Sequence, residues 1–143
     1  MPLIGFHSLC ELRQRIIVSR DEGQAREHRA QNVDGCRVSH YKIDGTVIRD
    51  ASKRCDFLLM NDDLSDAYLI ELKGTNIEDA LEQLEATAQV LQHALHGYRI
   101  KYRLVHSKAR THALNGNKFK KFQKRHGSSG EFLHRERVLE EII

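Results

Sequence analysis

The chain has 143 residues, of which 40% are hydrophobic and 30% charged, as expected for one globular domain with a single core. One proline and nine glycines exclude a collagen-like or low-complexity chain. The sequence contains no apolar run long enough to predict a membrane span, and its N-terminus lacks the apolar stretch of a signal peptide. Cys10, Cys36 and Cys55 are widely spaced, which favours reduced thiols in a cytoplasmic protein over a disulfide framework or a zinc site.

The formal net charge of +3 conceals an uneven distribution of charge along the chain. Residues 1–96 carry 11 Lys and Arg against 16 Asp and Glu, whereas residues 97–130 carry ten Lys and Arg and no acid. Residues 131–143 are again acidic. A basic block of this kind is typical of a surface that contacts a phosphate backbone, and a solvated lysine-rich surface is the alternative interpretation.

The first 50 residues predict a helix followed by a hairpin. Residues 8–11 (Ser-Leu-Cys-Glu) have the spacing of a capping box, which predicts a helix that begins near Ser8. Its apolar stripe comprises Leu9, Leu12, Ile16 and Ile17. Residues 21–32 are polar and favour a helix or a loop. Residues 36–43 alternate as a strand, and the turn at residues 44–45 predicts a hairpin into residues 46–49.

The middle of the chain predicts a second hairpin and an amphipathic helix. Residues 54–60 and 67–73 are short and apolar, and they flank a turn-rich segment; pairing Met60 with Ala67 sets their register. Residues 75–78 (Thr-Asn-Ile-Glu) form a second capping box, which starts a helix that Gly97 ends. The buried face of this helix comprises Ile77, Ala80, Leu81, Leu84, Ala88, Leu91 and Leu95.

The basic block predicts a strand and a helix. Residues 98–106 alternate strictly, so that Ile100, Tyr102 and Leu104 lie on one face and Arg99, Lys101 and Arg103 on the other. Residues 118–126 predict a helix anchored by two phenylalanines, and residues 132–143 predict a strand or a short helix. The order of elements predicts an α/β (α+β) domain with a mixed central sheet.

Two carboxylates and a lysine form the candidate site. Glu71 and Lys73 leave the same face of the strand at residues 67–73, and in the expected register Asp56 stands opposite Glu71. Two carboxylates across a sheet repel each other, and their apolar neighbours would half-bury them. A divalent cation resolves this conflict, and carboxylate oxygens suit Mg²⁺ or Mn²⁺. The alternative is an ordinary salt bridge between Glu71 and either Lys73 or Arg54 on an exposed face.

These residues resemble a known enzyme family. Residues 53–59 (Lys-Arg-Cys-Asp-Phe-Leu-Leu) and 68–74 (Tyr-Leu-Ile-Glu-Leu-Lys-Gly) are similar to the PD-(D/E)xK core of restriction-endonuclease-like nucleases. In that family an Asp opens one strand, and a (D/E)-x-K triplet lies on its hairpin partner. The resemblance covers residues 36–106 in the family's αβββαβ order, and Cys55 stands where the name-giving proline would be.

The resemblance implies a role for each residue of the motif. Asp56, Glu71 and the backbone carbonyl of Leu72 would bind Mg²⁺ or Mn²⁺, and Lys73 would assist the attack of water. Members similar to the RecB-type nucleases carry a Q-x-x-x-Y motif on the next helix, and Gln83 matches its first position.

The chain departs from the family pattern at one position, and the position of one further acid is not fixed by the sequence. Thr87 replaces the tyrosine of the Q-x-x-x-Y motif. The family often adds an acid from its first helix, and Glu11, Glu22 and Glu27 are the candidates here.

Together these observations predict one nuclease-like domain over residues 1–143, with a core at 36–106 and a basic extension at 107–143. We expect a cytoplasmic, Mg²⁺-dependent endonuclease that hydrolyses nucleic acid, DNA rather than RNA, as a homodimer or within a larger assembly. Its nucleic-acid contacts would be Arg99, Lys101, Arg103, Lys118, Lys120, Lys121 and Lys124. The alternatives are a catalytically weak nucleic-acid-binding module of the same fold and a protein-interaction domain.

Overall fold

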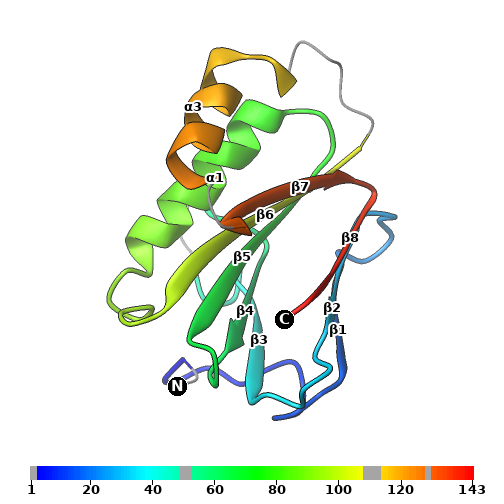
Figure 1. Cartoon of the computed structure of the whole chain (residues 1–143), viewed down its shortest axis with the longest axis vertical. Coiled ribbons are helices and arrows are strands. Elements are labelled where there is room, and N and C mark those ends of the chain that lie inside the picture. Colours follow the sequence, from blue (N-terminus) through cyan, green and yellow to red (C-terminus); the bar gives the residue numbers. More distant parts are fainter. Residues whose placement is uncertain (1–2, 49–52, 108–113, 128–129) are drawn as a thin grey trace.

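The computed structural model describes residues 3–48, 53–107, 114–127 and 130–143, and it has an α+β architecture with mixed sheets (Figure 1). The larger sheet has the strand order β3-β4-β5-β6-β7. Its strands are β3 (Val38–Lys42), β4 (Phe57–Asn61), β5 (Asp66–Lys73), β6 (Arg99–His106) and β7 (Phe132–Glu136). The smaller sheet comprises β1 (Ile16–Ser19), β2 (Glu27–Gln31) and β8 (Val138–Ile142).

The hairpin predicted at the centre of the larger sheet is confirmed. Strands β3, β4 and β5 form an antiparallel meander, and Met60 pairs with Ala67 in the expected register. Helix α1 (Ile77–Val90) then crosses over, so that β6 lies parallel to β5. Strand β7 continues the sheet, parallel to β6. The elements of this region therefore follow one another in the order βββαβ.

Helices cover one face of the larger sheet. The predicted apolar face of α1 packs on this side, and α3 (Asn117–His126) adds the buried side chains of Phe119 and Phe122. Helix α1 ends at Val90 rather than at Gly97, and its N-cap is Asn76, whose side chain accepts the Asp79 N–H.

The smaller sheet covers the opposite face. Ile17, Ala30 and Leu139 of this sheet belong to one buried cluster with Phe57, Leu59, Tyr68 and Ile70 of the larger sheet. Residues 132–143, predicted as one strand or helix, form β7 in one sheet and β8 in the other, so the tail joins the two sheets. Neither α1 nor α3, in the part of the chain that is described, is long and apolar enough to cross a membrane.

The helix predicted near Ser8 is wrong. Leu9 and Leu12 are each 61% exposed, and the chain becomes regular only at β1. The Leu9 N–H donates to the His40 carbonyl and the Val38 N–H donates to the Leu12 carbonyl, each at 2.7 Å. This segment therefore runs along β3, where hydrogen bonds to an otherwise open strand edge outweigh the local capping preference.

Two further expectations from the first 50 residues are corrected. Residues 21–32, expected as helix or loop, contain β2, whose alternate residues His28 and Ala30 are buried. The strand expected at 46–49 is absent over the described residues up to Ile48, which hold a single bridge between Asp44 and Ile48; residue 49 lies outside the described residues. Strand β3 pairs with β4 instead.

Candidate functional site

The hairpin of β4 and β5 places two carboxylates side by side. Phe57 pairs with Ile70, so Asp56 comes opposite Glu71 one step beyond the paired residues. The Asp56 N–H donates to the Ile70 carbonyl at 3.1 Å, and the Leu72 N–H donates to Asp56 Oδ2 at 2.8 Å. The backbone of β5, the strand that carries Glu71, thus holds the Asp56 carboxylate in place through the Leu72 N–H.

Both carboxylates lie on the helix-covered face, where Glu71 is buried and Asp56 is half-buried. Glu71 alternates with Leu69, which packs in the core beneath α1, and it is only 2% exposed. Its Oε1 atom is buried, and among the described residues it has no hydrogen-bond partner. A buried carboxylate oxygen without a partner carries the full cost of lost hydration, so this geometry is unfavourable for an ionised Glu71.

The pKa values of Glu71 and Asp56 are both raised, as expected for two carboxyls that are close together and shielded from water. Burial raises the pKa of Glu71 to about 9, the neighbouring Asp56 raises it further, and only Lys73 opposes them. Burial also raises the pKa of Asp56 to about 6, against the lowering effect of the Leu72 N–H. Without a cation the pair therefore retains a proton at neutral pH, as like-charged carboxyls in contact do.

Asp21 is a nearby acid that the sequence analysis missed. It lies between β1 and β2, and its charge raises the pKa of both Asp56 and Glu71. The three acids considered from the sequence lie elsewhere: Glu11 and Glu22 are exposed, and Glu27 in β2 forms ion pairs with arginines of the smaller sheet. The local sequence does not distinguish Asp21 from Glu22 as the acid near the site. The fold distinguishes them, because the turn after β1 places Asp21 near Asp56 and Glu71.

Lys73 and Gln83 meet on the same face. The Lys73 Nζ donates to Asp79 Oδ2 at 2.8 Å and to Gln83 Oε1 at 3.3 Å, both on α1. The structure thus brings the two predicted residues together beside the first half of the helix. Lys73 is a quarter exposed, so its ammonium group lies at the rim of the site rather than in the core.

Thr87 links α1 to the segment before β4 that carries Asp56. Its hydroxyl donates to the Gln83 carbonyl at 2.7 Å and accepts the Cys55 N–H at 2.6 Å. The residue is fully buried. The residue that departs from the Q-x-x-x-Y pattern therefore connects the helix to the backbone next to Asp56.

The donor set fits a hard divalent cation. Two carboxylates are adjacent, and the N–H and C=O of a strand residue point to the same side, so the Leu72 carbonyl faces the side of Asp56. Oxygen ligands of this type suit Mg²⁺ or Mn²⁺. Across the described ranges no group of three or more His, Cys, Asp or Glu side chains is arranged to hold a metal, so a cation here also needs carbonyl and water ligands.

The basic residues expected to contact nucleic acid are mostly paired with acids. Arg103 is only 2% exposed, and its Nε donates to Glu141 Oε2 at 2.7 Å, which corrects its expected place on the surface. Arg99 and Lys101 both form ion pairs with Asp66, at 2.8 and 3.2 Å.

A similar pairing links the two helices. Lys118 of α3 forms an ion pair with Glu82 of α1, and Arg125 pairs with Glu85. Lys120, Lys121 and Lys124 are exposed, and the described part of the chain holds no ion pair for them. Among the described residues of the basic block, Lys120, Lys121 and Lys124 of α3 are therefore the lysines without an ion pair, because acids distant in sequence pair with Arg99, Lys101, Arg103, Lys118 and Arg125.

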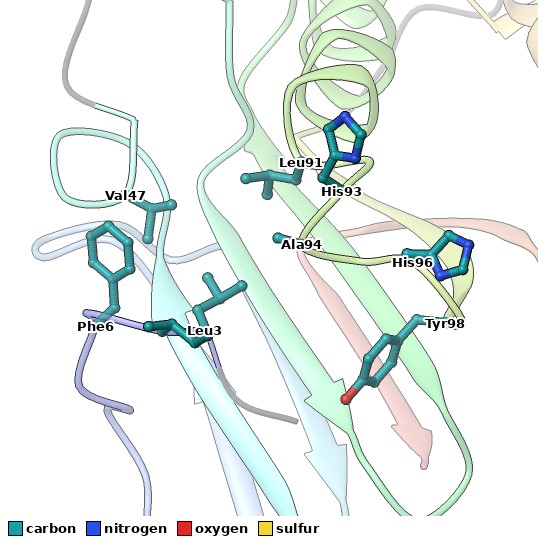
Figure 2. A pocket seen from close by; sticks show the side chains of 9 residues that line it. Leu3, Phe6, Val47, Leu91, His93, Ala94, His96 and Tyr98 are labelled. Carbon is teal, nitrogen blue, oxygen red and sulfur yellow. The ribbon is translucent and has the colours of Figure 1, made fainter.

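An apolar pocket lies far from these residues (Figure 2). Its volume is about 440 Å³, and Leu91, His93, His96 and Tyr98 line it after the end of α1. Lys73 precedes the other end of the helix, which is about 20 Å long for its 14 residues. The pocket is thus separate from the carboxylate pair.

No family model, curated protein or solved structure matches this chain. A function is therefore inferred from the geometry of Asp56, Glu71 and Lys73 and from the fold that holds them.

Proposed function

We propose that this protein is a metal-dependent nuclease that hydrolyses phosphodiester bonds of nucleic acid, DNA rather than RNA. The observation that carries the proposal is the pair of the half-buried Asp56 and the buried Glu71, in which Glu71 Oε1 has no hydrogen-bond partner among the described residues. Buried like charges are destabilising unless a cation lies between them. Groups so perturbed cluster at functional sites.

The arrangement of elements supports a restriction-endonuclease-like core of the PD-(D/E)xK type. The meander β3-β4-β5, helix α1 and strand β6 follow the βββαβ part of that family's order. The departure is at the N-terminus, where β1 and β2 stand in place of the first helix. An additional acid would then come from the turn after β1, where Asp21 lies, rather than from a helix.

Each residue of the site has a distinct role in the proposal. Asp56, Glu71 and the Leu72 carbonyl hold Mg²⁺ or Mn²⁺, which when bound polarises the phosphate and makes water a better nucleophile. Lys73, on the same face, orients the water or neutralises charge that develops on the phosphate. Gln83 positions the Lys73 ammonium group through the hydrogen bond between them.

The interpretation of the hairpin charges as ordinary surface salt bridges finds little support. It requires Glu71 to pair with Lys73 or Arg54 on an exposed face. Glu71 is instead buried, Lys73 donates to Asp79 and Gln83, and Arg54 Nε donates to Asp44 at 2.8 Å. The preference for DNA and the formation of a homodimer stay predictions.

The test is a cleavage assay with Mg²⁺ or Mn²⁺ on supercoiled, linear, single-stranded and branched DNA and on RNA. We expect Lys73→Ala to lower kcat by about 10²–10³, the usual cost of one lost charge-stabilising group. Lys53→Ala is a matched control, because Lys53 also pairs with Asp79 but is exposed. Its rate should stay within about twofold of the wild type.

Two outcomes contradict the proposal. The first is no cleavage of any substrate by the wild-type protein with either cation. The second is equal cleavage by the wild type and Lys73→Ala. Binding of nucleic acid without cleavage would favour the catalytically weak binding module instead.

A further inference from the structure

Arg26 is held at the end of the larger sheet with much of its hydrogen-bonding capacity unused. Its Nη1 donates to the Ser107 hydroxyl at 2.9 Å, and its Nη2 donates to Gln24 Oε1 at 3.1 Å. Its Nε is buried, and within the described residues it has no hydrogen-bond partner. A guanidinium has five N–H donors, so an acceptor from outside the chain can still bind the second N–H of Nη1 and of Nη2.

The neighbouring arginines of the same region are neutralised, and Arg26 is not. Arg20 and Arg29 lie within 4.0 Å of Glu27, and Arg29 also pairs with Glu140. The described residues place no carboxylate within 4.0 Å of Arg26. Because a half-buried cation without a counter-ion is costly, a structural role alone does not account for it.

Arg26 lies directly beyond the proposed catalytic residues. A Cβ on Gly74 would lie 4.0 Å from Arg26 Nη1, and Gly74 follows Lys73 in the chain. The Ser107 N–H donates to the carbonyls of Lys73 and Gly74, which fixes the hydroxyl that holds the guanidinium. From Glu71 to Gly74 the chain advances about 10 Å, so the long side chain of Arg26 lies within one or two nucleotides of a phosphate at the carboxylate pair.

We propose that Arg26 binds the phosphate of the nucleic acid that neighbours the scissile one, with the Ser107 hydroxyl orienting its guanidinium. This inference rests on the proposed nuclease function. The turn between β1 and β2 then serves the site twice, because it carries both Asp21 and Arg26. Nη1 and Nη2 each keep one N–H beyond the bonds to Ser107 and Gln24, and this pair of N–H groups matches two oxygens of a phosphate.

The experiment compares Arg26→Ala with Arg29→Ala; Arg29 lies in the adjoining strand β2 and is already ion-paired. We measure binding of a short labelled single-stranded DNA with EDTA present, so that no cleavage occurs, and then cleavage with Mn²⁺. Arg26→Ala should raise the Kd and the KM about tenfold, the cost of one charged hydrogen bond, with kcat within about twofold. The slope of log Kd against log salt should fall by about 0.7, the loss of one phosphate contact.

A second pair of variants guards against misfolding of Arg26→Ala. Gly74→Ala adds only the Cβ that the space allows, whereas Gly74→Asp places a carboxylate beside the guanidinium. Gly74→Asp should weaken DNA binding about tenfold, and Arg26→Ala in the Gly74→Asp background should add no further loss.

The two proposals fail in different ways. If the wild type binds DNA through Arg26 but cleaves nothing, the nuclease proposal falls and the phosphate contact stands. If the wild type cleaves DNA, but Arg26→Ala matches Arg29→Ala in Kd, KM and salt slope, the inference about Arg26 is overturned. A loss confined to kcat would also overturn it, because it would place Arg26 in the chemistry rather than in binding.

Discussion

Strands β5 and β6 separate two buried clusters of ionisable groups that behave in opposite ways. On the helix-covered face, burial raises the pKa of Glu71 to about 9. On the face covered by the smaller sheet, burial would also raise the pKa of Glu141, but hydrogen bonds from His28 and Arg103 lower it below its ordinary value. The Glu141 carboxylate accepts Arg103 Nε and Nη2 at 2.7 and 3.1 Å and His28 Nε2 at 2.7 Å.

The two carboxylates differ in whether the chain itself supplies a counter-ion. Arg103 pairs with Glu141, so the cluster of His28, Arg103 and Glu141 holds the two sheets together. Glu71 faces another carboxylate, and Lys73 donates to residues of α1 rather than to it. Burial of a charge therefore indicates a functional site only where the protein leaves it uncompensated.

We expect the largest effect on stability from removing the Arg103 guanidinium, which is the counter-ion of Glu141. Arg103→Leu should lower the free energy of unfolding by about 3 kcal/mol, because it leaves the half-buried Glu141 without its main partner. Urea denaturation measures this loss. Arg99→Leu, on an arginine of the same strand that is 70% exposed, should cost less, about 1 kcal/mol, because Lys101 still pairs with the buried Asp66. Equal costs for the two variants would show that the buried cluster adds nothing to stability.

Added Mg²⁺ or Mn²⁺ should have the next largest effect on stability, and it should act through the pair of Asp56 and Glu71 alone. At a hundredfold excess over its Kd, Mg²⁺ or Mn²⁺ should add about 2.7 kcal/mol to the stability of the wild type. Glu71→Gln should abolish this gain, and Glu140→Gln, which alters an exposed acid, should keep it. Thermal unfolding measures the change. A gain that survives in Glu71→Gln would place the cation elsewhere.

The two carboxylates should give opposite pH dependence. The folded-state pKa of Glu71 lies above its unfolded value of 4.5, so without metal its contribution makes stability fall between about pH 4.5 and 9, by at most about 1.4 kcal/mol per pH unit. The pKa of Glu141 is lowered on folding, so its stabilising contribution is present above pH 4.5 and is lost as pH falls through the folded-state pKa. Denaturation of Glu71→Gln across this range should show a flatter profile than the wild type; an unchanged profile would contradict the assignment.

The smallest expected effect concerns the residue that supports the carboxylate pair. Thr87→Val keeps the shape of the side chain but removes its hydrogen bonds to Gln83 and Cys55, which leaves a buried N–H unpaired. We expect a loss of about 1–2 kcal/mol in chemical denaturation, together with a lower kcat. Thr75→Val, at an exposed position before α1, is the control and should change neither. A stability loss without any change in kcat would limit Thr87 to the fold.

The parts of the molecule that follow from local pattern were predictable. The Met60–Ala67 register, the helix at Ile77 and the strand at 99–106 depend on alternation, helical spacing and turn residues that lie close together in the chain. The register alone was enough to place Asp56 opposite Glu71. The N-terminal segment was not predictable in this way, since Leu9 bonds to His40 of β3 rather than to its own neighbours.

The sequence by itself determined the central hairpin, the helix after it and the set of residues that could bind a cation. The tertiary structure alone decided which charges are compensated. Acids distant in sequence neutralise Arg99, Arg103, Lys118 and Arg125, and the turn after β1 brings Asp21 and Arg26 to the site. The physical reason is that alternation and helical period act over a few residues, whereas charge pairing and burial depend on contacts between segments that only folding brings together.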